Sequence, residues 1–246
     1  MRSGAGNKFR GVFFDLYGTL LVFNDIDKSW NDWAATFFEL IAHKTGMSFN
    51  EFAGNCGNFM SREVKKDLAS GLTTYETKIK KHCDSLGIEL TAGELKKVAD
   101  ETPRAWQKYI SVAPDAVKVL EELKRNKVLA LITNFDHTPH IGKTLANFNL
   151  EPFFRKIIIS DEVNASKPDP VIFRIALEQT GLEPDEVIFI GDNPIDDIEG
   201  AYAAGIEPVL IIHETFRSKH DYGPGKEETR AIPDNVRVIH SLSELL

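Results

Sequence analysis

The chain has 246 residues, of which 42% are hydrophobic and 27% charged, as is typical of a soluble globular protein with one large domain or a core and a smaller partner. Its formal net charge of −8 argues against nucleic acid as a partner, because a nucleic-acid footprint needs a surplus of basic residues. No apolar run reaches membrane-spanning length and the N-terminus lacks a signal-peptide core, so we expect a cytoplasmic protein with no membrane partner. Cys56 and Cys83, the two cysteines, are expected to be free thiols.

The first predicted element is a buried strand that ends in an acid. Residues 12–14 are apolar on both faces, Asp15 follows, and Gly18 and Thr19 then suit a sharp backbone turn. Three later apolar runs are also typical of buried strands leading into polar residues: 128–132 before Thr133 and Asn134, 157–159 leading toward Lys167, and 187–190 before Gly191 and Asp192. Because ligands of open α/β sheets bind outside the carboxyl ends of the strands, we expect these polar groups to converge on one crevice.

An insert with a helical pattern follows the first strand, from about residue 23 to residue 112. Aromatic and aliphatic residues recur at helical spacing between Trp30 and Ile41, and a second helix is expected near Asn50. Thr73 and Thr91 each precede a glutamate by three residues, which predicts two more capped helices. We find no strand pattern inside the insert. Trp30, Trp33 and Phe37 offer apolar surface for a substrate, although packing within the insert is their expected role.

From Pro114 onward helical and strand patterns alternate, which is typical of parallel β-α units. We therefore predict an α/β fold with a doubly wound parallel sheet, in which the strand ending at Asp15 is central. The core domain would comprise residues 10–22 and 113–246, and residues 23–112 would form a smaller, all-helical domain. Residues 1–8 are expected to be a disordered leader and residues 215–229 a mobile loop, and a last strand is expected near 236–239.

Four motifs, in this order, resemble those of the haloacid dehalogenase-like hydrolases, a superfamily made mostly of phosphatases. They are Asp15 with Gly18 and Thr19, the pair Thr133 and Asn134, Lys167 within residues 166–170, and the acidic cluster at residues 191–197. The resemblance runs from about residue 10 to the C-terminus outside the insert. It implies a Rossmann-like core and a helical cap, inserted between the first two motifs, that closes over the site.

The resemblance also implies a role for each motif residue. Asp15 would be the nucleophile, since a carboxylate can attack phosphorus and form an acyl-phosphate that water later splits. Lys167 would bind a phosphoryl group and hold Asp15 ionised, and Thr133 and Asn134 would donate hydrogen bonds to the transferring oxygens. These residues make up the expected catalytic and substrate-binding set, together with Tyr17.

A magnesium site is implied beside the nucleophile. Asp15, Asp192 and the backbone carbonyl of Tyr17 would be its ligands, because Mg²⁺ prefers oxygen donors. Asp196 would orient the metal waters or pair with Lys167. Asp197 would face solvent on the same helix.

Tyr17 is the departure from the phosphatase pattern, which usually has a second aspartate there as general acid. Tyrosine has a pKa near 10 and is a poor substitute unless its surroundings change that value. We favour a magnesium-dependent phosphatase that acts on a small phosphate ester through an aspartyl-phosphate, as a monomer or homodimer. The Asp-x-Tyr-Gly-Thr spelling also keeps open a metal-free 2-haloacid dehalogenase, and a third reading is a binding protein that has kept the fold without the activity.

Overall fold

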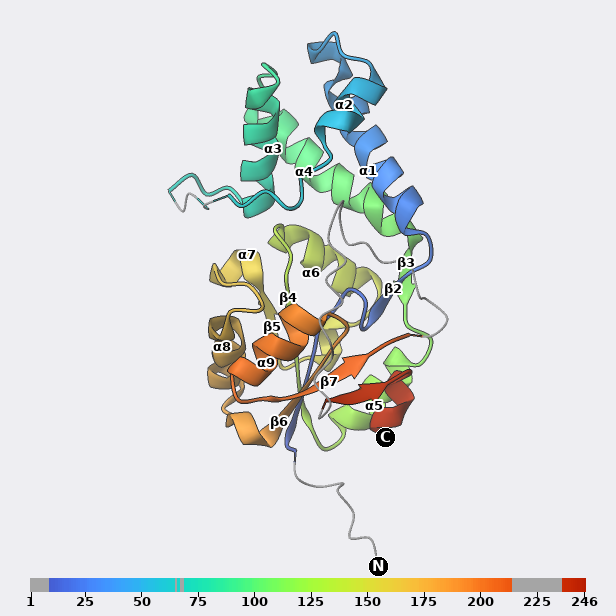
Figure 1. The fold of residues 1–246 in the computed structure, drawn as a ribbon, viewed down its shortest axis with the longest axis vertical. Helices are drawn as coiled ribbons and strands as arrows, with labels where there is room; N and C mark the ends of the chain where they lie inside the picture. Colours follow the sequence, from blue (N-terminus) through green and yellow to red (C-terminus); the bar gives the residue numbers. More distant parts are fainter. Residues whose placement is uncertain (1–8, 65, 67–68, 214–235) are drawn as a thin grey trace, which may run out of the picture.

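The computed structural model of the protein describes residues 9–64, 66, 69–213 and 236–246 (Figure 1). The irregular segments expected at residues 1–8 and 215–229 lie outside the described residues.

A six-stranded parallel sheet forms the centre of the lower part of the molecule in Figure 1, with the strand order β5-β4-β1-β6-β7-β8. Strand β1 lies between β4 and β6, which confirms the predicted centre of the sheet. Phe14 at the end of β1 is level with Leu131 and Ile190 of its two neighbours, so the residues after these strands reach the same edge. The strand bounds are β1 Gly11–Phe14, β4 Val128–Thr133, β5 Lys156–Ile159, β6 Val187–Gly191, β7 Glu207–Ile211 and β8 Arg237–Ile239.

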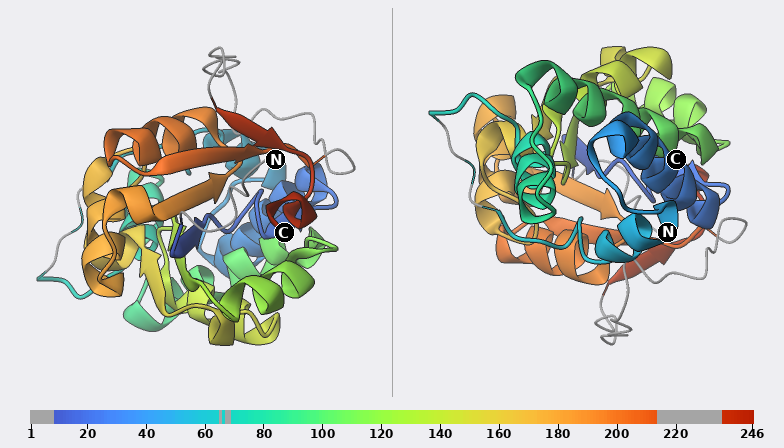
Figure 2. Two further views of the ribbon diagram at one scale, coloured as in Figure 1. Left: turned by 90° about the horizontal axis from the view of Figure 1, so that it is seen from below. Right: turned by 90° about the horizontal axis from the view of Figure 1, so that it is seen from above.

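Helices cover both faces of this sheet, as the view from below in Figure 2 shows. Successive residues of β1 point to opposite faces: Val12 and Phe14 belong to one apolar cluster, and Phe13 belongs to the other. Residues of α5 and α6 join the first cluster and residues of α8 and α9 join the second, so the sheet is doubly wound as predicted. The bounds are α5 Ala116–Lys124, α6 Thr138–Asn147, α7 Ser160–Val163, α8 Pro170–Thr180 and α9 Gly200–Ala203.

Four helices form a separate layer above the carboxyl edge of the sheet, which we call the α1–α4 layer (Figure 1). They are α1 Ile26–Ile41, α2 Phe49–Asn55, α3 Thr74–Ser85 and α4 Ala92–Trp106. The capping boxes predicted at Thr73 and Thr91 are present, and Ser48 makes a third. The division of the chain into two domains stays a prediction, because the apolar core of this layer is continuous with the cluster on the α5 and α6 face.

The prediction that the insert contains no strand was wrong at its two ends. Strand β2, Leu21–Phe23, pairs antiparallel with β3, Ile110–Val112, where the chain enters and leaves the α1–α4 layer. Each strand is three residues long and its partner lies almost ninety positions away, so neither carries a periodic pattern of its own.

Aromatic side chains fill the interior of the α1–α4 layer. Phe37 is fully buried against the rings of Trp33, Phe52 and Phe59, and the Trp33 Nε1 donates a hydrogen bond to the Tyr75 hydroxyl at 2.7 Å. Trp33 and Phe37 therefore pack within the layer, which is the role the sequence favoured for them.

We predict that Phe37→Ala lowers the free energy of unfolding by about 3–5 kcal/mol, because it opens a cavity among rings that cannot collapse onto it. Phe49, which is 39% exposed and contacts Phe38, is the matched control: Phe49→Ala should cost less than half as much. Urea unfolding of the two variants measures the difference. An equal loss in both would show that the aromatic interior is not the main support of the layer.

Candidate active site

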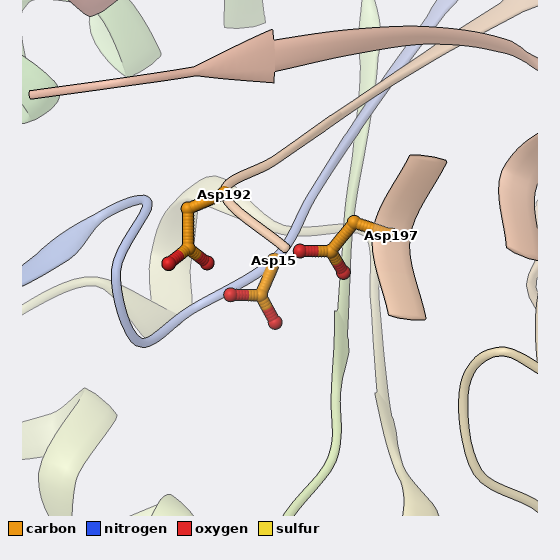
Figure 3. Close-up of side chains that lie close together, drawn as sticks. All are labelled: Asp15, Asp192 and Asp197. Atoms are coloured by element: carbon orange, nitrogen blue, oxygen red, sulfur yellow. The ribbon is translucent and has the colours of Figure 1, made fainter. Parts of the chain in front are cut away.

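The carboxyl ends of β1 and β6 bring three aspartates together. Figure 3 shows the side chains of Asp15, Asp192 and Asp197 turned toward a common space. One carboxylate oxygen from each lies within 4.8 Å of the other two, with Asp15 and Asp197 buried and Asp192 half-buried. The sequence predicted that Asp15 and Asp192 would meet at one edge of the sheet, and they do.

Lys167 joins two of these carboxylates. Its side chain is 3% exposed, and its Nζ donates to Asp15 Oδ1 at 2.5 Å and to Asp197 Oδ1 at 2.6 Å. Burial alone would lower the pKa of Lys167, but the negative charges of Asp15 and Asp197 outweigh it and hold that pKa above its ordinary value. Lys167 is therefore a fixed positive charge beside Asp15.

Asp197 is the acid that pairs with Lys167, so its expected exposure to solvent was wrong. Residues Pro194–Glu199 form a π-helical segment, in which Asp197 turns toward the end of β6 and accepts a hydrogen bond from the Asn193 N–H at 2.9 Å. Gly191 makes room for it, since a Cβ there would lie 2.3 Å from the Asp197 carboxyl carbon. Asp196 is half-buried and is approached at 3.5 Å by the Asn134 amide.

Asn134 holds the backbone of Lys167 in place. Its Oδ1 accepts from the Lys167 N–H and its Nδ2 donates to the Lys167 carbonyl, each at 2.9 Å. Thr133 is buried at the end of β4, immediately before it. Contacts of Thr133 and Asn134 with a substrate stay a prediction, whereas the structure gives Asn134 a positioning role that its sequence motif does not reveal.

The turn after Asp15 is pressed against Asp192. Gly18 has a φ of +92°, and a Cβ on it would lie 2.2 Å from Asp192 Oδ2. Only glycine combines that backbone conformation with such a close approach. The glycine of the first motif therefore sets the position of Asp192 as well as the shape of the turn.

The Tyr17 side chain reaches the end of helix α4. Its hydroxyl donates to Gln107 Oε1 at 2.7 Å, and its ring lies 5.1 Å from that of Trp106 and 5.6 Å from that of Phe135. Burial raises the pKa of Tyr17 above its ordinary value, so the hydroxyl stays protonated at neutral pH. Trp106 Nε1 and Gln107 Nε2 are buried and have no hydrogen-bond partner among the described residues. The contacts of Tyr17 with Trp106 and Gln107 were not predicted, because both partners belong to the insert and lie about ninety positions away in the chain.

The charges of the site favour a cation. Burial raises the pKa of the Asp15 carboxyl above its ordinary value, and the positive charge of Lys167 opposes that rise. One ammonium among three carboxylates leaves an excess of negative charge, which a divalent ion held by carboxylate oxygens would balance. Asp15 and Asp192 are the pair best suited to hold such an ion, since both oxygens of Asp197 already accept hydrogen bonds, Oδ1 from Lys167 and Oδ2 from the Asn193 N–H.

Comparison with known proteins shows the family of the chain. The sequence model of the haloacid dehalogenase-like hydrolase family matches residues 9–205. A phosphoserine phosphatase from Thermus thermophilus is 37% identical over 141 residues, which cover 56% of this chain and 52% of that protein, so the chain spans about half the length of this relative.

Two solved structures share the fold over almost the whole chain. A HAD phosphatase from Thermococcus onnurineus has a TM-score of 0.63 at 23% identity and covers 96% of each chain. A 2-haloacid dehalogenase from Pseudomonas syringae pv. Tomato has a TM-score of 0.65 at 22% identity, again over 96% of each chain. At these identities both likenesses concern the fold alone.

We predict that Asp197→Asn lowers the free energy of unfolding by about 1–3 kcal/mol, because it weakens a buried, charge-assisted hydrogen bond to Lys167. Asp196→Asn is the matched control one residue away, on a half-buried carboxylate that does not touch Lys167, and it should change stability by less than half as much. Urea unfolding at pH 7 measures both. A larger loss of unfolding free energy for Asp196→Asn than for Asp197→Asn would show that Asp196 is the acid that pairs with Lys167.

Proposed function

This chain is a haloacid dehalogenase-like hydrolase, and from that premise we propose that it is a magnesium-dependent phosphatase that cleaves a small phosphate ester through an aspartyl-phosphate on Asp15. The phosphatase activity of the Thermus relative supports a phosphate ester as the substrate. We place the enzyme in the cytoplasm, as a monomer or homodimer. No helix among the described residues is both long and apolar enough to cross a membrane.

The main support for the proposal is that the carboxylates of Asp192 and Asp15 lie close together. A 2-haloacid brings a carboxylate to the nucleophile, and a second carboxylate within 4.8 Å would repel it. The same pair suits a phosphate ester, because Asp15, Asp192 and the Tyr17 carbonyl would hold Mg²⁺, which when bound neutralises charge between the carboxylates and the phosphate. The dehalogenase is therefore the less favoured reading.

In the first step Asp15 attacks phosphorus. Lys167 takes Oδ1, so we assign the attack to Oδ2. A bond forms between Oδ2 and phosphorus while the bond from phosphorus to the ester oxygen breaks, and the electron pair leaves with that oxygen. The Lys167 ammonium is placed to stabilise the charge on the transferring oxygens.

In the second step water attacks the phosphorus of the aspartyl-phosphate. The Asp15 oxygen leaves with its electron pair, the carboxylate is restored, and the proton of the water goes to the released phosphate or to solvent. Asn134 serves both steps by fixing the Lys167 backbone, and Asp197 serves them by fixing the Lys167 ammonium.

Tyr17 is a poor proton source for the leaving oxygen. Its hydroxyl proton is donated to Gln107, and burial raises its pKa, which makes the proton harder to release. The substrate should therefore have a leaving group that departs without much help.

We predict that Asp192→Ser lowers turnover of p-nitrophenyl phosphate by roughly 10²-fold or more and removes Mg²⁺ binding, because it deletes one of two carboxylate ligands. Asp185→Ser, at the exposed opposite end of β6, is the matched control and should change neither. Phosphate release and metal titration calorimetry with vanadate present are the measurements. Halide release from a 2-haloacid, together with no Mg²⁺ binding by the native protein, would favour the dehalogenase instead.

We also predict that the native enzyme turns over aryl phosphates about 10²-fold faster than alkyl phosphates, which is the size of the missing general-acid contribution. p-Nitrophenyl phosphate and glycerol 3-phosphate give the comparison. Tyr17→Phe should leave the ratio of the two rates unchanged. A selective loss of the alkyl rate in that variant would show that Tyr17 is the general acid after all.

A further inference from the structure

An open pocket of about 490 Å³ lies between α4 and α6. Helix α4 belongs to the α1–α4 layer, whereas α6 covers the sheet, so the pocket spans both. Asp15, Asp192 and Lys167 are not among its lining residues. Its volume suits a small metabolite.

Three cationic side chains line this pocket. Arg104 and Lys108 come from the end of α4 and the turn after it, and Lys143 comes from α6. Asp100 is the single acid in the lining, and burial lowers the pKa of His140 to about 3, so this histidine is neutral. The lining residues thus carry three positive charges and one negative charge, whereas Glu101 and Asp32, the partners of Arg104 and Lys108, lie outside the lining.

Each cation is available for exchange with a ligand. Arg104 pairs with Glu101, Lys108 with Asp32 and Lys143 with Asp100, and the three basic side chains are 61%, 58% and 53% exposed. Ion pairs this open to solvent are weak, so an anion that meets all three cations at once can displace them.

A buried polar atom at the pocket wall also lacks a partner. Gln107 lines the pocket, its Oε1 accepts from Tyr17, and its Nε2 has no hydrogen-bond partner in the described part of the chain. A ligand oxygen could satisfy this donor after a small rotation of the Gln107 side chain, whose Oε1 contacts Tyr17 in the turn that follows Asp15.

We propose that the pocket between α4 and α6 binds a small polyanion, a phosphorylated or polycarboxylated metabolite, at a site distinct from the Asp15 site. Arg104 and Lys143 hold its anionic groups from opposite sides, and Lys108 and Gln107 add further donors. Because these residues come from two layers, the bound anion links the α1–α4 layer to the helix that covers the sheet.

The test uses the full chain, freed of metal over a chelating resin, at low ionic strength. Inorganic pyrophosphate and citrate are the two probes, which distinguish a phosphoryl from a carboxylate preference. Backbone amide NMR locates the binding, and calorimetry gives the affinity. Neither readout requires catalysis, so the result is independent of the proposed phosphatase activity.

We expect saturable shifts at residues 104–108 and 140–147 with at least one probe. The double variant Arg104→Ala/Lys143→Ala should bind at least about tenfold more weakly, since two charge-assisted hydrogen bonds are lost. Lys97→Ala, which removes an exposed positive charge from the same helix outside the pocket, should leave the affinity within about twofold. Asp100→Asn should tighten binding, because it frees Lys143 and removes the one acid.

The NMR result would overturn the proposal if the shifts were confined to residues near Asp15 and Lys167, or if neither probe gave saturable shifts. The affinities would overturn it if the double variant bound as tightly as the native protein, or if Lys97→Ala lost as much affinity as the double variant. Binding by Asp100→Asn that is no tighter than native would overturn it as well.

Discussion

The buried ammonium of Lys167 is the interaction on which the rest of the site depends. Asp15 and Asp197 are both buried, and two carboxylates at that depth cannot both stay ionised without a cation between them. Lys167 supplies that charge from the segment after β5, and Asn134 holds its backbone from the end of β4. Asp15, Asp197 and Lys167 thus come from the segments that follow three parallel strands, and the parallel order of these strands is what lets them meet.

The segment that follows β4 also ties the α1–α4 layer to the sheet. Asp136 forms an ion pair with Lys78 at 2.6 Å, and its carbonyl accepts from the Tyr75 N–H at 2.8 Å. Asp161 accepts from the Thr74 N–H at 2.8 Å, so the start of α3 is held at two points. Asn134 lies two residues before Asp136 in the same segment. A movement of α3 would therefore bear on the loop that positions Lys167, which gives a direct physical route from the helical layer to the Lys167 ammonium.

The sequence predicts local features well and misses those that depend on exact register. The buried strands, the capped helices and the meeting of Asp15 with Asp192 follow from apolar runs, capping boxes and the geometry of parallel sheets. The choice between Asp196 and Asp197 as the partner of Lys167 does not, because a π-helical segment rotates the side chains relative to an ordinary helix. Pairing of β2 with β3, and the contact of Tyr17 with Gln107, join residues about ninety positions apart, which no short-range pattern encodes.

Position 17 links the chemistry of the site to the packing of the helical layer. The Tyr17 ring stacks on Phe23 and Phe135 and meets the edge of Trp106, while its hydroxyl is fixed by Gln107. A shorter acidic side chain would leave a gap among these rings and would not span the distance that the tyrosine covers. The turn after Asp15 is thus held against the end of α4, and Tyr17, which holds it there, donates its hydroxyl proton to Gln107. A leaving group that is already stable as an anion would remove the need for that proton, so the packing of Tyr17 and the proposed preference for good leaving groups have the same cause.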